Sequence, residues 1–483
     1  MSLLNKKYEA VIGLEVHAQL RTMTKAYSSE ENIYGAKPNT KTSFISLGHP
    51  GTLPKINKKV IDYAIKLGLS LGSKIRKENR YARKNYFYAD LPKGYQITQD
   101  KTPICDGGQI IIHNEQEKRR LIGITRIHME EDAGKSIHDL DPFHTLIDLN
   151  RAGVPLLEIV SEPDLRSSHE AYQYINQIRR LVKYLDICDG NMEEGSLRCD
   201  ANISVRIKGS KEFGTKVEVK NMNSTTNVKR AIDFEINRQI NMLEKKEIII
   251  SETRTYNAQK NITLTMREKE SANDYRYFPE PDIPPVIITE EYINSIEKNL
   301  PPLPDELLER FITKMNLSKY DADILTQEKD VAMYFTDLCL FTKQYKIAAN
   351  IMNGCVRSYL NENAISIDQF NIEPKQLASL VKLIDSGKIN NTIANNKIFP
   401  EMLNSNKMAE DIAKEKDWIQ ESDTNTMNDY IKLALNKYPE KVEEYKKGKK
   451  GLIGLFMGEI MKLSKGKADP KIANKLLQNE LNK

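Results

Sequence analysis

Apolar and polar residues alternate with a period of two in several segments of the first half of the chain. In residues 10–18 every second residue is apolar, and Glu15 and His17 fall between the apolar positions. Because side chains alternate across a strand, this pattern predicts a strand with one buried face and with Glu15 and His17 together on the other. Residues 216–220 alternate in the same way.

The most regular alternation lies in residues 196–207, SLRCDANISVRI. The apolar residues of this segment are predicted to point inward: Leu197, Cys199, Ala201, Ile203, Val205 and Ile207. The polar residues are predicted to share the opposite face: Ser196, Arg198, Asp200, Asn202, Ser204 and Arg206. This polar face would form either the floor of a charged cleft or the solvated side of an antiparallel sheet.

Turn residues and prolines interrupt the alternation and help to divide the chain. Glycine turns between the strand patterns predict a large, mainly antiparallel β domain with inserted helices. The proline-rich run PEPDIPPVII at residues 279–288 marks its end, and helical periodicity dominates afterwards. A second break is expected near Phe399 and Pro400, before a Lys-rich tail with helical stretches at residues 428–436 and 452–464.

These patterns predict an α+β chain with three domains, since 483 residues are too many for one ordinary core. The expected domains are a β cradle over residues 1–294, a helical domain over 295–402 and a small helical tail over 403–483. No internal repeat and no low-complexity tract interrupts them.

Composition narrows the class of protein. Charged residues make up 29% and hydrophobic residues 40% of the chain, with both signs interspersed, which predicts a soluble globular protein and not a disordered one. No apolar run approaches the roughly 18 residues of a membrane span, and no secretory signal pattern is present, so we expect a cytoplasmic protein without a membrane partner. The five cysteines form no CxxC pair, which predicts reduced and mostly buried thiols.

The positive charge of the chain is concentrated in its tail. Residues 437–483 contain 12 Lys against 6 acids, a net charge of +6, which leaves −1 for the first 436 residues because the whole chain carries +5. A basic tail suits a phosphate backbone, but a Lys-rich helical segment can equally be a solvated surface.

Acidic residues in apolar surroundings are candidates for chemistry. Glu158 lies within the apolar run VPLLEIV, where a carboxylate is costly to bury unless it is paired or bound to metal. Glu130 and Glu131 follow another apolar stretch, in HMEEDAGKS at residues 128–136. Glu15 and His17, two residues apart, could ligate Mg²⁺, Mn²⁺ or Zn²⁺, or could simply face water on a surface strand.

The run RYARKNYFY at residues 80–88 interleaves Arg80, Arg83 and Lys84 with four aromatic residues. Such a run could bind a nucleotide or a nucleic-acid end, or could be ordinary packing with solvated bases. The AGKS at residues 133–136 is not a phosphate-binding P-loop, because Met129 stands where that motif needs glycine. No amidase nucleophile motif is visible either, so the chain is not expected to hydrolyse an amide. If its reaction uses ammonia, a partner protein would have to supply it.

Six long runs, in order, resemble the signature motifs of the B subunits of the GatCAB tRNA amidotransferases. They are IGLEVHAQL (12–20), RKNYFYADLPKGYQI (83–97), GITRIHMEEDAGKS (123–136), LNRAGVPLLEIVSEPD (149–164), EEGSLRCDANIS (193–204) and DYRYFPEPD (274–282). The tail is similar to the YqeY module, most clearly in KGKKGLIGLFMGEIMKLSKGKADP. The resemblance spans nearly the whole chain.

The resemblance implies a carbon–nitrogen ligase that works within a heterotrimer. The A subunit would free ammonia from glutamine, and the C subunit would tie it to the B subunit. The B subunit would use ATP and Mg²⁺ to phosphorylate the side-chain carboxylate of Glu-tRNA(Gln) and/or Asp-tRNA(Asn), and ammonia would then displace the phosphate. The basic tail would bind tRNA, and neither DNA nor a membrane is an expected partner.

Family motifs also imply roles for individual residues. The expected metal ligands are Glu15, His17, Glu131 and Glu158. The expected catalytic residues are Lys84, Lys93, Asp200 and Glu131, of which the first three would line the ammonia route. Arg83, Lys84 and Arg198 are expected to bind the nucleotide.

One departure from the family concerns zinc. Many relatives carry cysteines for a structural zinc where this chain has AYSSEEN (26–32) and TSFISLGHPG (42–51), so we expect no zinc. Two other functions stay open at this stage: a non-catalytic tRNA-binding subunit, and a free-standing amino-acid kinase, which would not need the helical and basic regions.

Asp200 or Glu131 is our hypothesis for the group that removes the proton of ammonium, because both belong to the charged face. Replacing the acting carboxylate by alanine should lower ammonia-dependent turnover, because no other group then takes the proton. Turnover that hardly changes in both Asp200→Ala and Glu131→Ala would contradict this hypothesis.

Overall fold

The computed structural model describes residues 7–268, 275–419, 424–464, 468 and 470–482. The chain forms two compact units, Met1–Leu303 and Pro304–Lys483. Asp274 of the sixth sequence run and residues 465–467 and 469 of the tail run lie outside the described residues. The predicted α+β class is confirmed, since a largely antiparallel sheet fills the first unit and helices form the second.

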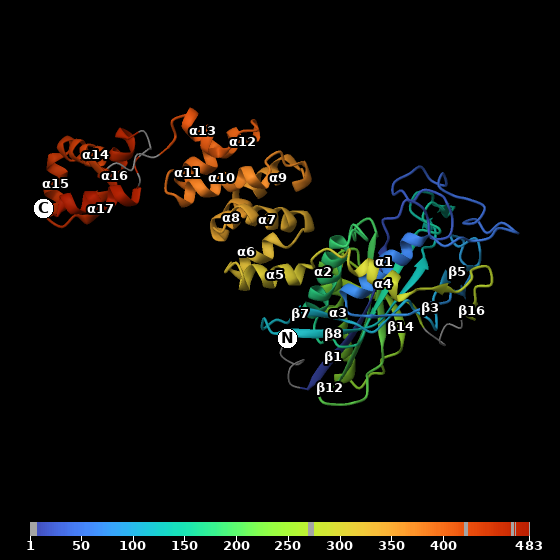
Figure 1. Ribbon diagram of the computed structural model, residues 1–483. Helices are drawn as coiled ribbons and strands as arrows, with labels where there is room; N and C mark the ends of the chain where they lie inside the picture. Colours follow the sequence, from blue (N-terminus) through green and yellow to red (C-terminus); the bar gives the residue numbers. More distant parts are fainter. Residues whose placement is uncertain (1–6, 269–274, 420–423, 465–467, 469, 483) are drawn as a thin grey trace. The chain divides into compact units, whose positions relative to one another are not determined.

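A ten-stranded sheet is the centre of the first unit (Figure 1). Its strand order is β15-β14-β13-β12-β1-β11-β8-β6-β2, with β7 paired to β8. Within the described residues, β13 and β14 form its one parallel pair. The strands are β1 Tyr8–Gln19, β2 Lys74–Ile75, β6 Cys105–Asp106, β7 Gln109–His113, β8 Arg119–Glu131, β11 Pro155–Ser161, β12 Leu197–Ile207, β13 Val217–Lys220, β14 Glu252–Asn257 and β15 Ile262–Glu268.

Three helices bury the apolar side chains of this sheet. They are α1 Lys58–Ser70, α2 Ser168–Tyr184 and α3 Thr225–Glu244, and α2 packs along α3 while α3 lies against β12. The side chains of Ser167 and Ser224 accept hydrogen bonds from the first turns of α2 and α3, which satisfies backbone donors that a helix start leaves open.

The predicted alternation of the two long segments is confirmed, with one exception. The alternate residues from Ala10 to Ala18 of β1 and from Leu197 to Val205 of β12 are buried in the core. Ile207 was predicted to point inward, but 62% of it is exposed. It is the last residue of β12 and pairs with Tyr8, the first residue of β1, so it lies at the end of the sheet where the core stops.

Smaller sheets surround the main one. The three-stranded sheet β16-β4-β5 consists of Phe278–Pro279, Ala82–Asn85 and Tyr95–Thr98, and β5 packs against β8. The residues of the RKNYFY run are thereby held beside the end of β8. The remaining short pairs are β3 Glu78–Asn79 with β17 Val286–Ile287, and β9 Lys135–Ile137 with β10 Leu146–Asp148. Helix α4, Glu290–Glu297, packs on α1.

The second unit is helical. Its first part contains α5 Pro304–Thr313, α6 Lys319–Leu325, α7 Lys329–Phe341, α8 Tyr345–Ile351, a π-turn η1 Met352–Val356, α9 Arg357–Asn363, a 3₁₀ turn η2 Ile367–Gln369, α10 Pro374–Asp385, α11 Asn391–Ile393, a π-turn η3 Ala394–Ile398, α12 Phe399–Leu403 and α13 Ala409–Glu415. Its last part contains α14 Thr424–Lys437, α15 Pro439–Lys446, a 3₁₀ turn η4 Lys450–Leu452, α16 Ile453–Leu463 and α17 Pro470–Leu481.

The two helical stretches expected in the tail fall within α14 and within η4 with α16. Helices α14, α16 and α17 pack around a core of their own, with Ile431, Phe456 and Leu477 at its centre. The boundary between the two compact units lies at Leu303 and Pro304. The division of the chain at residues 294 and 402 stays a prediction.

The expected break at Phe399 and Pro400 is wrong. The chain is helical from Asn391 to Leu403, through α11, the π-turn η3 and α12. Pro400 lies in the first turn of α12. A proline inside a helix lacks the N–H for the usual hydrogen bond, and the wider π-turn directly before it accommodates this loss without ending the helix.

No helix among the described residues has both the length and the hydropathy needed to span a membrane. The five cysteines are all free, as predicted, and Cys105, Cys188 and Cys199 are buried.

Candidate functional site

The polar face of the main sheet carries a continuous row of ionisable side chains. In the register of four neighbouring antiparallel strands, His128 of β8 lies opposite Glu158 of β11. Glu158 lies opposite His17 of β1, and His17 lies opposite Arg198 of β12. Directly opposite residues of antiparallel strands have neighbouring side chains, so the register alone gathers these four groups.

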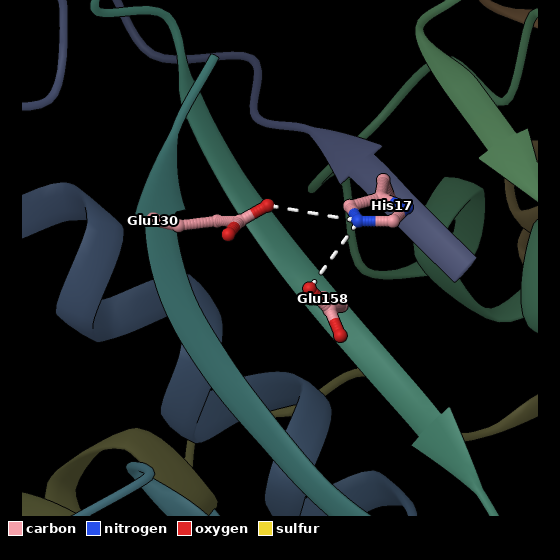
Figure 2. A group of neighbouring side chains, drawn as sticks. All are labelled: His17, Glu130 and Glu158. Atoms are coloured by element: carbon pink, nitrogen blue, oxygen red, sulfur yellow. Dashed lines mark ion pairs between the residues drawn. The ribbon is translucent and has the colours of Figure 1, made fainter. Parts of the chain in front are cut away.

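His17, Glu130 and Glu158 form the first cluster (Figure 2). Nε2 of His17 lies 3.3 Å from Oε2 of Glu158 and 3.7 Å from Oε1 of Glu130. His128 approaches the same two carboxylates from β8: its Nε2 lies 3.2 Å from Oε2 of Glu158 and 3.7 Å from Oε2 of Glu130. Glu130 and His128 are only 3% and 5% exposed. Two carboxylates thus share a nearly water-free space with two imidazoles.

Electrostatics in the first cluster favour charged side chains in spite of burial. Burial alone would lower the pKa of His128, but the charge of Glu158 and hydrogen bonds to Glu130 and Glu158 outweigh it and raise the pKa to about 9. The pKa of His17 is likewise raised, since its hydrogen bond to Glu158 opposes the effect of burial. The charge of His128 holds the pKa of Glu158 well below its ordinary value, although burial acts in the other direction.

Glu15, Asp200 and Glu218 form the second cluster, beside the first on the same polar face. Asp200 lies opposite Glu15 in the register of β1 and β12. Burial, and then the charges of Glu158 and Asp200, raise the pKa of Glu15. The ammonium of Lys220 contacts Asp200 and lies 3.2 Å from Oε1 of Glu218. The ammonium therefore pairs with two of the three carboxylates, while Oε1 of Glu15 accepts a 2.8 Å hydrogen bond from Asn202.

Both clusters fit a divalent cation by the chemistry of their donors. In each, one ligand atom per residue lies within 4.8 Å of the corresponding atoms of the other two residues. The first offers an imidazole and two carboxylates, and the second offers three carboxylates. Carboxylate oxygens are the ligands that Mg²⁺ and Mn²⁺ prefer, and an imidazole is a common additional ligand.

Glu131 does not lie where the sequence analysis expected it. The predicted ligand set was Glu15, His17, Glu131 and Glu158, but the structure brings Glu130 to His17 and Glu158. Oε1 of Glu131 instead contacts the ammonium of Lys93 and accepts a 2.9 Å hydrogen bond from the backbone N–H of Ile97. Successive residues of a strand point to opposite faces, so one of the two adjacent glutamates must point away from the cluster.

Lys84, Lys93 and Arg198, which the sequence analysis also expected in the site, belong to neither of the two carboxylate clusters. The charges of Glu130 and Glu158 raise the pKa of Lys84, although burial alone would lower it, and the ammonium of Lys84 lies 4.9 Å from the centre of the Tyr275 ring. Lys93 is committed to Glu131. Arg198 donates a 2.7 Å hydrogen bond to Oδ2 of Asp132.

Arg83, the third residue expected to bind the nucleotide, is held by acidic residues of the loop after β16. Its guanidinium donates hydrogen bonds of 2.7 and 2.9 Å to the two carboxylate oxygens of Glu280, and one of 3.0 Å to Asp282. It also lies over the ring of Tyr95. A bidentate pair of this kind fixes a loop to a strand.

Sequence reasoning gave no role to Glu218, Glu130, His128 or Lys220. The alternation of residues 216–220 did place Glu218 and Lys220 on one polar face, but it could not say which strand lay beside them. His128 and Glu130 are two residues apart, like Glu15 and His17. This spacing places both side chains on one face of a strand, and it could have identified them as a second pair of candidate ligands.

Neutralising Glu158 should lower the pKa of both histidines in the metal-free protein. In Glu158→Gln the pKa of His128 should fall from about 9 by about one pH unit or more, because burial then acts with less opposition. Because the pKa of His128 is raised from 6.5 to about 9, its pairing with Glu130 and Glu158 contributes its full stability to the fold below pH 6.5. This contribution is lost as the pH rises through about 9. An NMR titration of the seven histidines, assigned with His17→Asn and His128→Asn, measures this. Unchanged titration of both residues would contradict the described contacts.

Comparisons with known proteins identify the family of this chain. Residues 10–294 match the family described as the GatB/GatE catalytic domain, and residues 333–481 match the GatB domain. The chain is 48% identical over 471 residues to the B subunit of the aspartyl/glutamyl-tRNA(Asn/Gln) amidotransferase of Thermodesulfovibrio yellowstonii, covering 98% of each chain. It is also 48% identical over 479 residues to the protein of that name from Bdellovibrio bacteriovorus, covering 99% of each. The resemblance seen in the sequence motifs is confirmed, and the chain belongs to the GatB family of tRNA-dependent amidotransferase B subunits.

Proposed function

We propose that this chain activates the side-chain carboxylate of glutamate or aspartate carried by a misacylated tRNA, using ATP and Mg²⁺. The observation that carries the proposal is the polar face of the main sheet, where buried carboxylates and imidazoles converge. Such a set is costly to bury without a counter-ion, and a divalent cation is the counter-ion that its donors fit.

His17, Glu130 and Glu158 would hold one Mg²⁺, and Glu15, Asp200 and Glu218 would hold a second. Bound Mg²⁺ would neutralise the charge that develops on the phosphates of ATP. Lys84 would bring its ammonium to the same phosphates from β4, since the charges of Glu130 and Glu158 act on it. In this proposal Glu130 takes the metal-binding role that the sequence analysis gave to Glu131.

Arg198 and Arg83 would serve the nucleotide less directly. Arg198 is oriented by Asp132, which also accepts a 2.8 Å hydrogen bond from Gln19, so its guanidinium is fixed on the floor of the site. Arg83 fixes the loop that carries Glu280 and Asp282. Both arginines would shape the nucleotide site, and Lys84 would be the side chain that contacts the phosphates.

The reaction would proceed in two steps. A carboxylate oxygen of the aminoacyl group attacks the γ-phosphorus of ATP, and ADP leaves with the electron pair of the broken P–O bond. Ammonia then attacks the carbonyl carbon, inorganic phosphate leaves with the former carboxylate oxygen, and an amide remains on the tRNA. The proton that ammonia or ammonium loses would pass to Asp200 or to Glu131, the two carboxylates proposed for this role.

The proposed reaction needs ammonia, which a partner protein would supply. The relatives are named as B subunits, which supports a multi-subunit enzyme. We propose an A subunit that frees ammonia from glutamine and a C subunit that joins it to this chain. The tail over residues 403–483, with a net charge of +6 over its last 47 residues, would bind the tRNA backbone. Since its substrate is a tRNA used in translation, we place the enzyme in the cytoplasm.

The alternative is a tRNA-binding subunit without catalytic groups, which the basic tail alone would support. It gives no reason for two acidic clusters to lie side by side on the polar face of the main sheet, one of them largely buried. ATP turnover that requires misacylated tRNA distinguishes the two functions, because a binding subunit shows salt-dependent tRNA affinity and no turnover.

Glu158→Gln should abolish most of the amidation. With the A and C partners, ATP, Mg²⁺ and ammonium chloride, product formation from Glu-tRNA(Gln) should fall by at least about a hundredfold, because the first cluster loses its central charge. Binding of the tRNA should be unchanged. Glu162→Gln is the matched control, since Glu162 only accepts a hydrogen bond from Thr125 at the surface. Equal product from Glu158→Gln and wild type would show that Glu158 is structural.

Adjacent glutamates should differ in metal binding. Glu130→Gln should weaken Mn²⁺ binding at the first cluster by at least about tenfold, because one of its three donors is lost. Glu131→Gln should leave Mn²⁺ affinity within about threefold of wild type and disturb Lys93 instead. Electron paramagnetic resonance of free Mn²⁺ measures both. The reverse order of effects would restore Glu131 as the ligand.

A further inference from the structure

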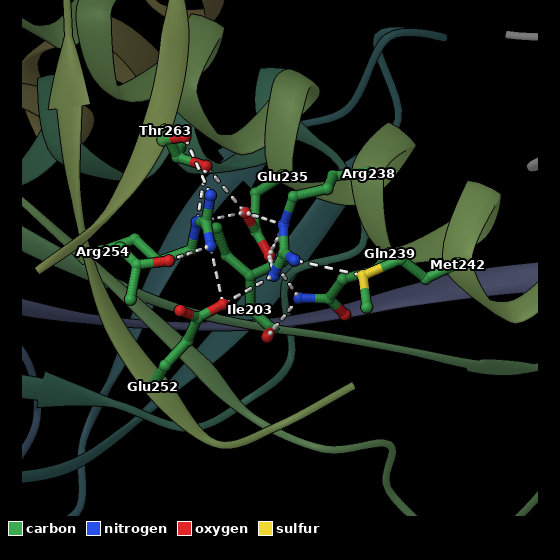
Figure 3. A network of polar contacts seen from close by, with 9 residues as sticks. Ile203, Glu235, Arg238, Gln239, Met242, Glu252, Arg254 and Thr263 are labelled. Atoms are coloured by element: carbon green, nitrogen blue, oxygen red, sulfur yellow. Dashed lines mark hydrogen bonds and ion pairs between the residues drawn. The ribbon is translucent and has the colours of Figure 1, made fainter. Parts of the chain in front are cut away.

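Strand β14 carries two different sets of side chains on its two faces. Glu252 and Arg254 point toward α3 (Figure 3), while Thr253, between them, points to the polar face of the sheet. All three are buried, and Thr253 is only 1% exposed. One face of β14 therefore contacts α3, and the other face contacts the second cluster.

On the helix side, a closed ionic network fixes β14 in place. Glu235 of α3 pairs with Arg238 and with Arg254, and Glu252 pairs with the same two arginines. Thr263 of β15 donates a 3.0 Å hydrogen bond to Glu235. Two arginines thus balance two glutamates, and removing one partner from such a buried set is strongly destabilising. The network has no excess charge for a ligand, and its role is to lock β14 to α3.

On the site side, Thr253 holds Glu218 of the second cluster. The hydroxyl of Thr253 donates a 2.8 Å hydrogen bond to Oε2 of Glu218. Lys220 lies 3.2 Å from the other oxygen, Oε1, and also contacts Asp200. Since Thr253 binds Oε2, Oε1 is the oxygen that faces Lys220, which in turn contacts Asp200. The orientation of the Glu218 carboxylate is thus set from a strand that contributes no acid to the cluster.

The pairing of β14 supports this role. Glu218 and Thr253 are register partners in the parallel pair of β13 and β14. Directly after Thr253, the pairing of β14 with β15 shifts by one residue in a β-bulge. Bulges re-aim side chains next to functional sites. Here the bulge lies at the residue whose hydroxyl reaches the cluster.

We propose that Thr253 is a positioning residue that turns Oε1 of Glu218 inward, so that Glu15, Asp200 and Glu218 together bind a second divalent cation. Lys220 holds the place of that cation in the metal-free protein and withdraws toward solvent when the metal binds. This inference rests on the proposed function, because it takes the second cluster to be a metal site. It adds a residue from β14 that no motif of the sequence singled out.

The test compares Thr253→Val with Thr253→Ser. Valine keeps the shape of threonine and removes the hydroxyl, whereas serine keeps the hydroxyl. Thr255→Val is the matched control, since Thr255 lies on the same strand face and accepts a hydrogen bond from Asn221, not from the cluster. Mn²⁺ binding to the metal-free chain, followed by electron paramagnetic resonance, gives the number and affinity of sites. Circular dichroism melts report whether each variant folds.

Wild type should bind two Mn²⁺, and Thr253→Val should weaken the second site about tenfold, the usual effect of losing a group that orients a ligand. Thr253→Ser and Thr255→Val should bind both ions as wild type does, and the first site should be unchanged in all three variants. Amidation by Thr253→Val should then need more Mg²⁺ for half-maximal rate, with a rate at saturating Mg²⁺ close to that of wild type.

Two results would overturn the proposal and leave the proposed function intact. One is a Thr253→Val protein that folds and binds both ions as wild type does. The other is a wild-type chain that binds a single Mn²⁺, lost in Glu130→Gln, while amidation proceeds. Absence of any Mn²⁺ binding together with absence of amidation would instead contradict the proposed function itself.

Discussion

The register of β8, β11, β1 and β12 is the constraint on which the site depends. Because these strands are antiparallel neighbours, His128, Glu158, His17 and Arg198 fall in one row across the sheet. Alternation within each strand places apolar side chains on the other face, where α2 and α3 help to bury them. A slip of one residue in any pair would exchange the two faces, so the same packing that stabilises the sheet also fixes the site.

Charge balance distinguishes the site from the structural network behind it. In the network of Glu235, Arg238, Glu252 and Arg254, two positive groups meet two negative groups. In the second cluster three carboxylates lie close together and the ammonium of Lys220 pairs with two of them, while burial, and then the charges of Glu158 and Asp200, raise the pKa of Glu15. A partly buried surplus of negative charge is unfavourable in the isolated chain, and a divalent cation would offset it. In the proposed function, binding of the cation would therefore relieve a repulsion that the fold itself imposes.

Sequence reasoning reached the parts of this arrangement that depend on local pattern. Alternation placed Glu15 and His17 on one face, and the apolar surroundings of Glu158 marked it as a paired or ligating group. Alternation puts Glu130 on the same face as His128 and Glu131 on the other, but only the register with β11 shows that the face of His128 and Glu130 is the one that meets Glu158. Thr253 was beyond reach for a similar reason: its role comes from a parallel partner strand 35 residues earlier in the chain, which no local period reveals.

The central claim is that this chain transfers phosphate to the carboxylate of the aminoacyl group. It can be tested by following one oxygen atom. Glu-tRNA(Gln) labelled with ¹⁸O in the side-chain carboxylate would be amidated by the complete enzyme with unlabelled ATP, and the released inorganic phosphate would be analysed by mass spectrometry. The account predicts that each amide formed releases a phosphate containing one oxygen from the carboxylate. Phosphate without ¹⁸O, formed alongside normal amide product, would mean that ATP is hydrolysed by water and would contradict the account.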